Sequence, residues 1–319
     1  MCVAITGVGS FAGARVAERL LDPARDCRVV AIDLELPRRL EGRVELHRID
    51  LTDPTADSQI AEVLEKERCD AVLHAAFFRD PIPDIEYSHE VEVVGSLHVM
   101  NAAAAVGVSR LVVMSSGLVY GPHPDNPNYL PERSPLRPHP ASHQARDRAE
   151  METLLALFAD RHPAISVTVL RPCWVIGPTI DHHVTRYLER SRVWLPLGYD
   201  PLLQFLHEDD LIRATEQALE NEVRGPVNLA GEEALPISTL LALADRSRWA
   251  VPVPFLYRWV ALDWLRRTGD SPAAFFDALR YLWTLDTRRA REELGFEPEY
   301  TTLEAWMSFV VSLRLRSYR

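Results

Sequence analysis

Lysine is almost missing from this chain, in which Lys66 is the only one among 35 lysines and arginines. Chemistry that needs a lysine amine at any other position is therefore excluded. The four cysteines, Cys2, Cys27, Cys69 and Cys173, form no closely spaced pairs. That scatter excludes a disulfide framework or a cysteine-rich zinc site and is typical of buried thiols in a reducing compartment.

Long apolar runs are also missing, since no stretch reaches the ~18 residues that a membrane-spanning helix needs. Glycines interrupt the first apolar run and no basic segment precedes it, so we expect a cytoplasmic protein without a leader peptide. The net charge of −11 argues against nucleic acid and anionic membranes as partners. What remains is a chain of 319 residues, 47% hydrophobic, which suits one large or two closely joined domains.

The N-terminus carries the pattern of a phosphate-binding loop. Residues 2–6 are apolar and predict a short buried strand, and apolar residues at helical spacing predict a helix over 11–21. Gly7, Gly9 and Gly13 mark the turn between them. Glycines allow a sharp turn and a close approach of the backbone, and the N-terminus of the following helix attracts a pyrophosphate.

An acidic residue at the end of the next strand supports a dinucleotide site. The apolar strand predicted over 28–33 ends in Asp33, twenty positions after Gly13. A carboxylate there accepts hydrogen bonds from the adenine ribose and repels a 2′-phosphate, so we expect NAD rather than NADP. Arg38 and Arg39 follow closely and offer charge that would weaken this preference.

Strands and helices alternate through the first half of the chain, which predicts a doubly wound α/β fold with a parallel sheet. We expect strands at 2–6, 28–33, 43–49, 69–74, 109–115 and 164–170, and helices at 11–21, 54–67, 84–106 and 142–161. Helices dominate after about residue 231, which predicts a small, mostly helical lobe. The expected division is a Rossmann domain at 1–170 plus 204–230 and a substrate-binding lobe at 171–203 plus 231–319.

Further motifs are spread in a defined order over residues 1–310. They are Thr6-Gly7 with Gly13, Asp50-Leu51, Asp70–Ala76, Ser115–Gly121, Leu170-Arg171-Pro172 with Gly177-Pro178, Phe205–Asp210 and Ala290–Pro298. Together they resemble the extended short-chain dehydrogenase/reductase family of the NAD-dependent epimerase/dehydratase type, except that Ser10 stands where a middle glycine is usual. The resemblance implies an NAD cofactor. Its expected contacts are Gly7, Gly9, Ser10, Phe11, Gly13, Asp33, Asp50, Leu51, Ala75, Ala76, Ser115, Arg146 and Pro172.

The residues that normally carry the chemistry of this family are replaced. Its members use a Tyr-x-x-x-Lys pair on the helix after the proline-rich loop, and matching Glu132–Pro138 and Glu150 to the family pattern places Ser142 and Arg146 there. The pKa of a serine hydroxyl is too high for it to act alone as an acid or base near pH 7, whereas arginine stays charged and can still bind a ribose. Ser116, which resembles the family's substrate-contacting serine, is kept. The candidate catalytic residues are therefore Ser116, Ser142 and Arg146.

Other side chains near this position are candidates to replace the missing tyrosine. His143 is next to Ser142, but neighbouring positions of a helix point about 100° apart. His123 and His139 belong to the proline-rich loop and Tyr120 follows the serine motif, so exposure to solvent is the simpler interpretation of the histidines. A further change is Glu92, which stands at the usual asparagine position of the family.

Two clusters contain histidine next to carboxylates, and we expect neither to bind a metal. The segment 207–210 favours a helix start, where acidic residues complement the helix dipole. Asp181-His182-His183 follows the segment that should face the substrate, so it favours lining of the substrate pocket over chelation. Adjacent histidines seldom hold one ion.

Aromatic residues gather in the last third of the chain, and a core between the lobe and the sheet is their simplest explanation. An apolar substrate pocket is the alternative. The residues are Trp249, Trp259, Trp264, Trp283 and Trp306, with Phe255, Tyr257, Phe275, Phe276 and Tyr281 among them. Arg186, Arg190 and Arg192 offer charge for a second pyrophosphate, so a sugar nucleotide also stays open as substrate.

Three functions stay open at this point. The first is an NAD-dependent oxidoreductase or epimerase with a relocated acid/base residue, acting on a small molecule that carries an alcohol or ketone. The second is a non-redox dehydratase or cyclase, and the third is a catalytically silent NAD-binding protein. The resemblance also implies a homodimer through helices 84–106 and 142–161. The apolar residues expected at that contact are Val91, Val94, Leu97, Met151, Leu154, Leu155 and Phe158.

Overall fold

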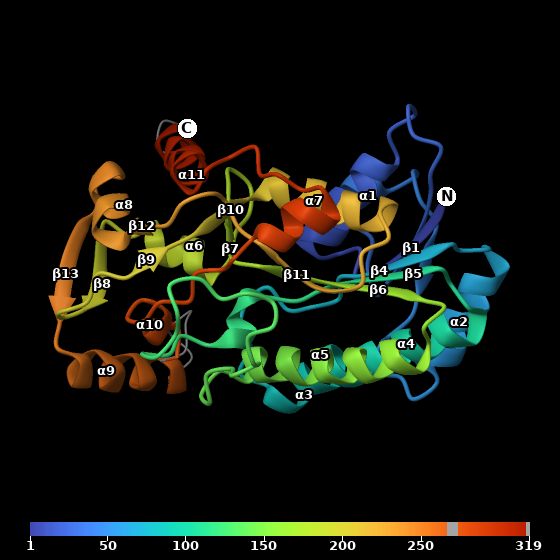
Figure 1. Cartoon of the computed structure of the whole chain (residues 1–319), viewed down its shortest axis with the longest axis horizontal. Helices are drawn as coiled ribbons and strands as arrows, with labels where there is room; N and C mark the ends of the chain where they lie inside the picture. Colours follow the sequence, from blue (N-terminus) through green and yellow to red (C-terminus); the bar gives the residue numbers. More distant parts are fainter. Residues whose placement is uncertain (267–273, 317–319) are drawn as a thin grey trace.

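A seven-stranded parallel sheet forms the centre of the computed structural model, which describes residues 1–266 and 274–316 (Figure 1). The strand order is β11-β6-β5-β4-β1-β2-β3, so the order reverses between β1 and β4. The strands are β1 (Cys2–Thr6), β2 (Arg28–Asp33), β3 (Leu46–Arg48), β4 (Ala71–His74), β5 (Arg110–Met114), β6 (Ser166–Pro172) and β11 (Gly225–Leu229). The doubly wound α/β fold predicted from the sequence is confirmed.

Helices cover both faces of this sheet (Figure 1). One face carries α1 (Phe11–Leu20) and α7 (Glu208–Glu220), and the other carries α2 (Ala56–Lys66), α4 (Gly95–Val106) and α5 (His143–Arg161). Every residue of β1, β4 and β6 is buried, as strands covered on both faces require. This double cover explains why the strands read as almost continuous apolar runs.

The helix predicted over 84–106 is three segments in succession. Asp84 caps α3 (Ile85–His89) by accepting a hydrogen bond from the Tyr87 N–H at 3.0 Å. A π-helical turn, Glu90–Val94, separates α3 from α4, and Gly107 ends α4 in a left-handed conformation. The π turn is what places the Glu92 side chain inside the protein, where it has no solvent exposure.

The second part of the chain is mostly helical but contains short strands that the sequence did not predict (Figure 1). Three two-stranded pairs form here: β10 with β7, β12 with β9, and β13 with β8. The elements are β7 (Trp174–Ile176), α6 (His183–Leu188), β8 (Arg192–Pro196), β9 (Leu202–Leu203), β10 (Phe205–His207), β12 (Leu235–Pro236), α8 (Ile237–Leu243), β13 (Ser247–Val251), α9 (Val253–Leu265), α10 (Phe275–Ala278) and α11 (Thr302–Arg316). The domain boundaries proposed from the sequence stay a prediction. Within the described ranges, no helix is both long and apolar enough to cross a bilayer.

The aromatic residues of the last third have three different environments. Trp306 packs in the core against Phe205, with ring centroids 5.6 Å apart. Trp249 and Trp259 are 50% and 53% exposed, so they line no core. Trp283 packs against Trp174, at 5.0 Å. The side chain of Trp264 lies outside the described residues. Trp283 and Trp306 are therefore buried packing residues, whereas Trp249 and Trp259 lie at the surface.

A buried ion pair ties α5 to the end of β6. Arg171 and Glu152 are 4% and 5% exposed, and the Arg171 Nε donates to Glu152 Oε2 at 2.8 Å. The Ser115 hydroxyl, at the end of β5, donates to the same carboxylate. Tyr120 accepts a hydrogen bond from Arg171, so the pair joins helix, strands and loop in one network.

Replacing Glu152 with leucine should lower the free energy of unfolding by about 3–5 kcal/mol, because Arg171 would stay buried without its counter-charge. Urea denaturation measures the change. Glu150→Ala is the control, since Glu150 is an exposed neighbour on the same helix and its loss should cost less than about 0.5 kcal/mol. Equal stability of the two variants would contradict the structural role of the pair.

Candidate functional site

The loop after β1 presses directly against the end of β4. Gly7 has a φ of +78°, and a Cβ there would lie 2.3 Å from the Ala76 backbone nitrogen. A Cβ at Gly13 would lie equally close to the Gly7 carbonyl oxygen. Ser10 caps α1 by accepting a hydrogen bond from the Gly13 N–H at 3.0 Å. This capping role explains how serine is accommodated at the usual position of a glycine.

A first cavity of about 240 Å³ opens beside this loop. It is lined by seven of the residues expected to contact the cofactor: Gly7, Gly9, Ser10, Asp33, Asp50, Leu51 and Ala76. The Asp33 carboxylate is held in place because it accepts hydrogen bonds from the Gly9 N–H at 2.8 Å and the Leu34 N–H at 2.7 Å. Phe77, Phe78 and Tyr87 complete the wall, and the sequence interpretation missed all three.

A second cavity of about 180 Å³ continues from the first and shares Ser10, Phe77 and Phe78 with it. Five further residues expected from the sequence line it: Phe11, Ala75, Ser115, Ser116 and Pro172. The two cavities together follow the carboxyl ends of the strands at the point where the strand order reverses, which is the usual ligand site of such sheets.

The structure does not bring Ser142 or Arg146 into the second cavity. Ser142 caps α5 by accepting a hydrogen bond from the Ala145 N–H at 3.3 Å, and it lines a small adjoining cavity of about 40 Å³. This small cavity shares five lining residues with the second cavity: Leu118, Gln144, Ala145, Trp174 and His183. The Arg146 side chain is exposed and contacts His143. The residues of α5 that line the second cavity are Gln144, Ala145 and Arg148, and its two polar members lie two positions later than the sequence interpretation placed the pair.

Helical periodicity explains this difference. Gln144, Arg148 and Glu152 follow one another at intervals of four and so lie on one face of α5. Glu152 is the inward carboxylate that binds Arg171, whereas Glu150, which set the expected register, is exposed. A match to the wrong glutamate therefore shifted the expected pair to a different face of the helix.

Gln144 and Arg148 hold the aromatic segment that lines both cavities. The Gln144 Nε2 donates to the Phe78 carbonyl oxygen at 2.5 Å and the Arg148 Nη2 donates to the same oxygen at 3.1 Å. Arg148 also donates to the Ser115 carbonyl oxygen, and its guanidinium lies 4.8 Å from the centre of the Phe77 ring. Neither an amide nor a guanidinium transfers protons near neutral pH, so the two side chains position and bind.

Ser116 has capacity left for a ligand. Its Oγ accepts a hydrogen bond from the Leu118 N–H at 3.2 Å, which leaves the hydroxyl proton free to donate into the cavity. Tyr120, by contrast, is buried and donates to Asn228, and burial raises the pKa of its hydroxyl to about 12. Of the histidines weighed for proton transfer, His123 contacts the Arg137 carbonyl, whereas His139 pairs with Asp277 and lines the small cavity beside Ser142.

The two adjacent histidines of the 181–183 cluster have different roles. His182 caps α6, and its second ring nitrogen contacts the Val175 carbonyl oxygen at 2.7 Å. Burial lowers the pKa of His182 to about 4, so this ring is neutral. His183 lines the second cavity, and its Nδ1 lies 3.4 Å from Asp80 Oδ1. Asp80, which the sequence gave no reason to select, follows β4 and is brought to His183 only by the fold.

The 207–210 segment is structural. The buried Glu208 accepts hydrogen bonds from the backbone N–H groups of Thr179 and Ile180, and His207 contacts Ser308. Over residues 1–266 and 274–316, no group of three or more histidine, cysteine and acidic side chains is arranged to hold a metal ion.

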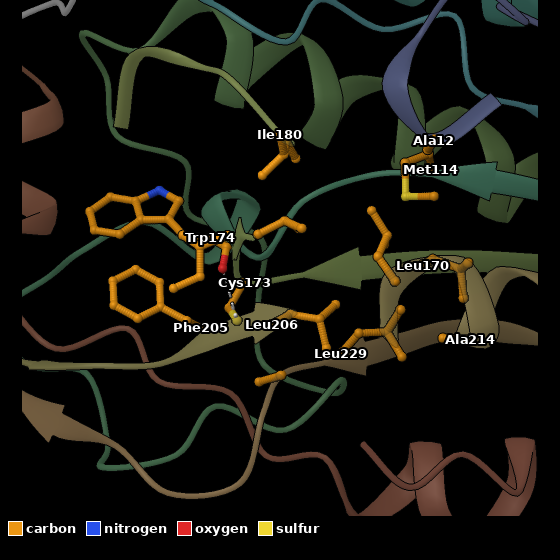
Figure 2. Close-up of a cluster of buried hydrophobic side chains, with 14 of the residues drawn as sticks. Ala12, Met114, Leu170, Cys173, Trp174, Ile180, Phe205, Leu206, Ala214 and Leu229 are labelled. Atoms are coloured by element: carbon orange, nitrogen blue, oxygen red, sulfur yellow. Dashed lines mark hydrogen bonds between the residues drawn. The ribbon is translucent and has the colours of Figure 1, made fainter. Parts of the chain in front are cut away.

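Most of the second cavity is apolar, and Figure 2 shows part of its lining. Met114, Cys173, Trp174 and Ile180 contribute to the wall. Trp174 is 6% exposed, and its indole N–H has no hydrogen-bond partner. A buried donor without a partner is costly, so this N–H is a destabilising feature of the wall.

Glu92 is a buried acid behind this wall. Its Oε1 accepts the Phe78 N–H at 2.9 Å and lies 3.6 Å from Arg148, while Oε2 has no partner. Burial raises the pKa of Glu92 to about 7, against the opposing attraction of Arg148. An acid with a raised pKa in the folded state costs no stability while it is protonated and becomes destabilising as the pH rises from about 4.5 to about 7.

Glu92→Gln should therefore stabilise the protein at pH 8 relative to the parent by up to about 3 kcal/mol more than at pH 4. Glutamine keeps the acceptor for the Phe78 N–H but removes the charge. Denaturation at several pH values measures this, with the exposed Glu90→Gln as the control. A pH dependence identical to that of the parent would show that Glu92 is not the buried acid responsible.

Comparison with known proteins agrees with this geometry. The model of the NAD dependent epimerase/dehydratase family matches residues 3–230. An uncharacterized protein of Mycobacterium tuberculosis is 33% identical over 314 residues, which are 95% of this chain and 82% of that protein. A 3-diazoavenalumate denitrifying reductase of Streptomyces is 26% identical over 221 residues, 65% of this chain and 70% of the reductase.

Solved structures show the same fold. The crystal structure of a UDP-glucose 4-epimerase from Thermus thermophilus in complex with NAD matches with a TM-score of 0.75 at 22% identity, over 98% of this chain and 99% of the epimerase. The family resemblance inferred from the motifs is confirmed: the chain belongs to the NAD-dependent epimerase/dehydratase family.

Proposed function

We propose that the protein is an NAD-dependent oxidoreductase or epimerase acting on a small molecule that carries an alcohol or ketone. The observation that carries the proposal is the pair of adjoining cavities, the first with Asp33 and the second with Ser116, which share Ser10, Phe77 and Phe78. A dinucleotide fits there because Gly7 and Gly9 allow a close approach of the backbone and α1 offers its N-terminus to phosphate. When bound, NAD supplies hydride transfer.

Arg148 takes over the cofactor role that the sequence suggested for Arg146. It lines the second cavity from α5 and stays charged, so it can keep hydrogen bonds to a ribose. Ser116 binds the reacting oxygen of the substrate through its hydroxyl. Ser142 is a helix cap in this proposal and has no chemical role.

The substrate we propose is more apolar than a sugar nucleotide. The second cavity is walled mainly by apolar side chains. The arginines considered for a second pyrophosphate are engaged elsewhere: Arg186 with Asp80 and Asp181, Arg190 over the Tyr187 ring and Arg192 over the Trp249 ring. The Streptomyces reductase is a relative whose name gives a substrate other than a sugar nucleotide.

NAD should bind more tightly than NADP, because Asp33 would lie against a 2′-phosphate. Arg39 offers little compensation, since it pairs with Glu18 at 3.4 Å. We expect a difference in dissociation constant of at least about tenfold, equal to about 1.4 kcal/mol, and a smaller one in Asp33→Ala. Fluorescence titration measures both, with the exposed Glu35→Ala as the control. Equal or tighter binding of NADP by the parent would refute the preference.

Apolar ketones and alcohols should stabilise the NAD-bound protein more than sugar nucleotides do. The reason is the apolar wall around Trp174 and the paired state of the nearby arginines. A thermal-shift panel of acetophenone, cyclohexanol, UDP-glucose and dTDP-glucose tests this expectation. Stabilisation by a sugar nucleotide alone would contradict the proposed apolar substrate and favour a sugar nucleotide instead.

A catalytically silent NAD-binding protein is the second candidate. It is favoured by Gln144 and Arg148, which direct donors to the Phe78 carbonyl oxygen and leave no proton-transferring group on this face of α5. The open second cavity next to Ser116 favours an enzyme instead, because a protein that only senses NAD does not need space for a substrate. Formation of NADH from NAD and an alcohol of the panel separates the two candidates.

We further propose a homodimer formed through the helical segment 84–106 and α5, in the cytoplasm. Met151, Leu155 and Phe158 are buried within one copy of the chain, so they do not serve this contact. The half-buried residues that remain for it are Val91, Val94, Leu97 and Leu154. The cytoplasmic location is supported by the four cysteines, which are all free.

A further inference from the structure

We propose that His183, oriented by Asp80, is the acid/base residue of this site and replaces the tyrosine that the family carries on α5. The proposal rests on the proposed function, since it names the group that exchanges a proton with the substrate oxygen. Three observations carry it: the composition of the cavity wall, the pairing of His183 with Asp80, and the fixed position of the ring.

Five ionisable side chains line the second cavity, and four of them are unsuited to proton transfer. Arg79 and Arg148 stay protonated at any ordinary pH. Cys173 is buried and its pKa is raised by that burial, so it stays a thiol. Both ring nitrogens of His182 are used, one by the α6 cap and one by the Val175 carbonyl. His183 is the fifth.

Asp80 determines which ring nitrogen of His183 is left for the ligand. Asp80 Oδ1 accepts the His183 backbone N–H at 2.6 Å and lies 3.4 Å from Nδ1. The contact with Nδ1 is at ion-pair distance rather than a hydrogen bond, and Nδ1 is buried without a hydrogen-bond partner, so Asp80 Oδ1 is the anionic atom beside it. With Nδ1 on the side of Asp80, Nε2 is the nitrogen on the opposite side of the ring and is left for a substrate.

The carboxylate that faces His183 is held in its charged form. Burial alone would raise the pKa of Asp80, but hydrogen bonds from His183 and Arg186 keep it well below its usual range. Arg186 Nη2 lies 3.1 Å from Asp80 Oδ2. A fixed anion beside Nδ1 favours the tautomer with its proton there and stabilises the imidazolium that forms when Nε2 takes a proton.

The His183 ring is packed in one orientation. It is 8% exposed, and the Phe275 ring meets it edge to face with centroids 5.5 Å apart. Its backbone begins α6, and the Asp80 contact fixes the other side. A group that transfers protons has to be positioned in this way to be effective.

The proton step balances as follows for oxidation of an alcohol. The O–H bond breaks and its proton forms an N–H bond at Nε2 of His183, while the electron pair stays on oxygen. That pair becomes the second bond of the carbonyl as the carbon gives up its hydrogen, with the bonding pair, to the oxidised nicotinamide. Ser116 donates a hydrogen bond to the same oxygen in both directions of the reaction.

The first test needs no turnover. Nitrogen NMR of isotopically labelled histidine, in protein without cofactor, reports which ring nitrogen carries the proton, and His183→Gln identifies the signal. We expect the neutral ring of His183 to be protonated at Nδ1, and Asp80→Asn to remove this preference. A ring protonated at Nε2 in the parent would overturn the proposal.

The second test separates the proton step from cofactor binding. His183→Gln should lower the turnover of cyclohexanol or acetophenone by about 10²–10⁴-fold and leave the dissociation constant of NAD unchanged. Added imidazole should restore part of the turnover in His183→Ala, which a purely structural role of His183 would not allow. His162→Gln, at the far end of α5, is the control for histidine loss.

The outcomes distinguish this proposal from the proposed function. Unchanged turnover in His183→Gln, with NAD bound, would overturn the role of His183 and leave the proposed function standing. Absence of NAD binding by the parent would overturn the proposed function. The NMR measurement of the His183 tautomer needs no NAD, so it would still show whether Asp80 pairs with Nδ1.

Discussion

The buried pair of Arg171 and Glu152 is the interaction on which the site depends. It fixes the end of β6 to α5, and the Ser115 hydroxyl after β5 donates a hydrogen bond to the same Glu152 carboxylate. Three parts of the site are thus held by one carboxylate. Because Glu152 points inward, the residues four and eight positions earlier point to the cavity as well. The inward orientation of the Glu152 carboxylate therefore determines that Arg148 and Gln144 are the polar side chains that α5 presents to the cavity.

The substitutions around this anchor form a consistent set. Arginine at position 148 is longer than lysine and reaches two backbone carbonyls, those of Ser115 and Phe78. Glu92 lies 3.6 Å from its guanidinium, and the acid in turn accepts the Phe78 N–H. Both polar groups of the Phe78 backbone are thus held by side chains. These contacts hold in place a segment that lines both cavities.

Sequence reasoning predicted the parts of the fold that depend on local patterns. Buried strands of a parallel sheet, the glycine turn and Asp33 each have signals within a few residues, and all are found where expected. The register of α5 has no such local signal: Glu132–Pro138 and Glu150 placed Ser142 and Arg146 at the expected pair, whereas Gln144 and Arg148 are in register with Glu152 and line the second cavity. The two glutamates are equally acidic neighbours in the sequence. Only the partner of Glu152, which lies on β6, distinguishes them.

Contacts over long distances in the chain left no local signal. Asp80 and His183 are 103 positions apart, and nothing in either neighbourhood marks them as partners. The π turn that buries Glu92 is equally invisible in a pattern of apolar residues. Such features depend on how the elements pack, so they are accessible only once the sheet order and the helix faces are known.

The few polar atoms of the second cavity define what it can bind. The Ser116 hydroxyl has a proton to donate, the Trp174 indole N–H has no partner, and His183 offers Nε2 opposite Asp80. Because the surrounding wall is apolar, each of these groups is costly to leave without a partner. A site of this kind rejects analogues that lack the matching oxygen far more strongly than analogues with an altered apolar part. In the proposed function, selectivity therefore follows the placement of the substrate oxygen between Ser116 and His183 rather than the recognition of a second phosphate.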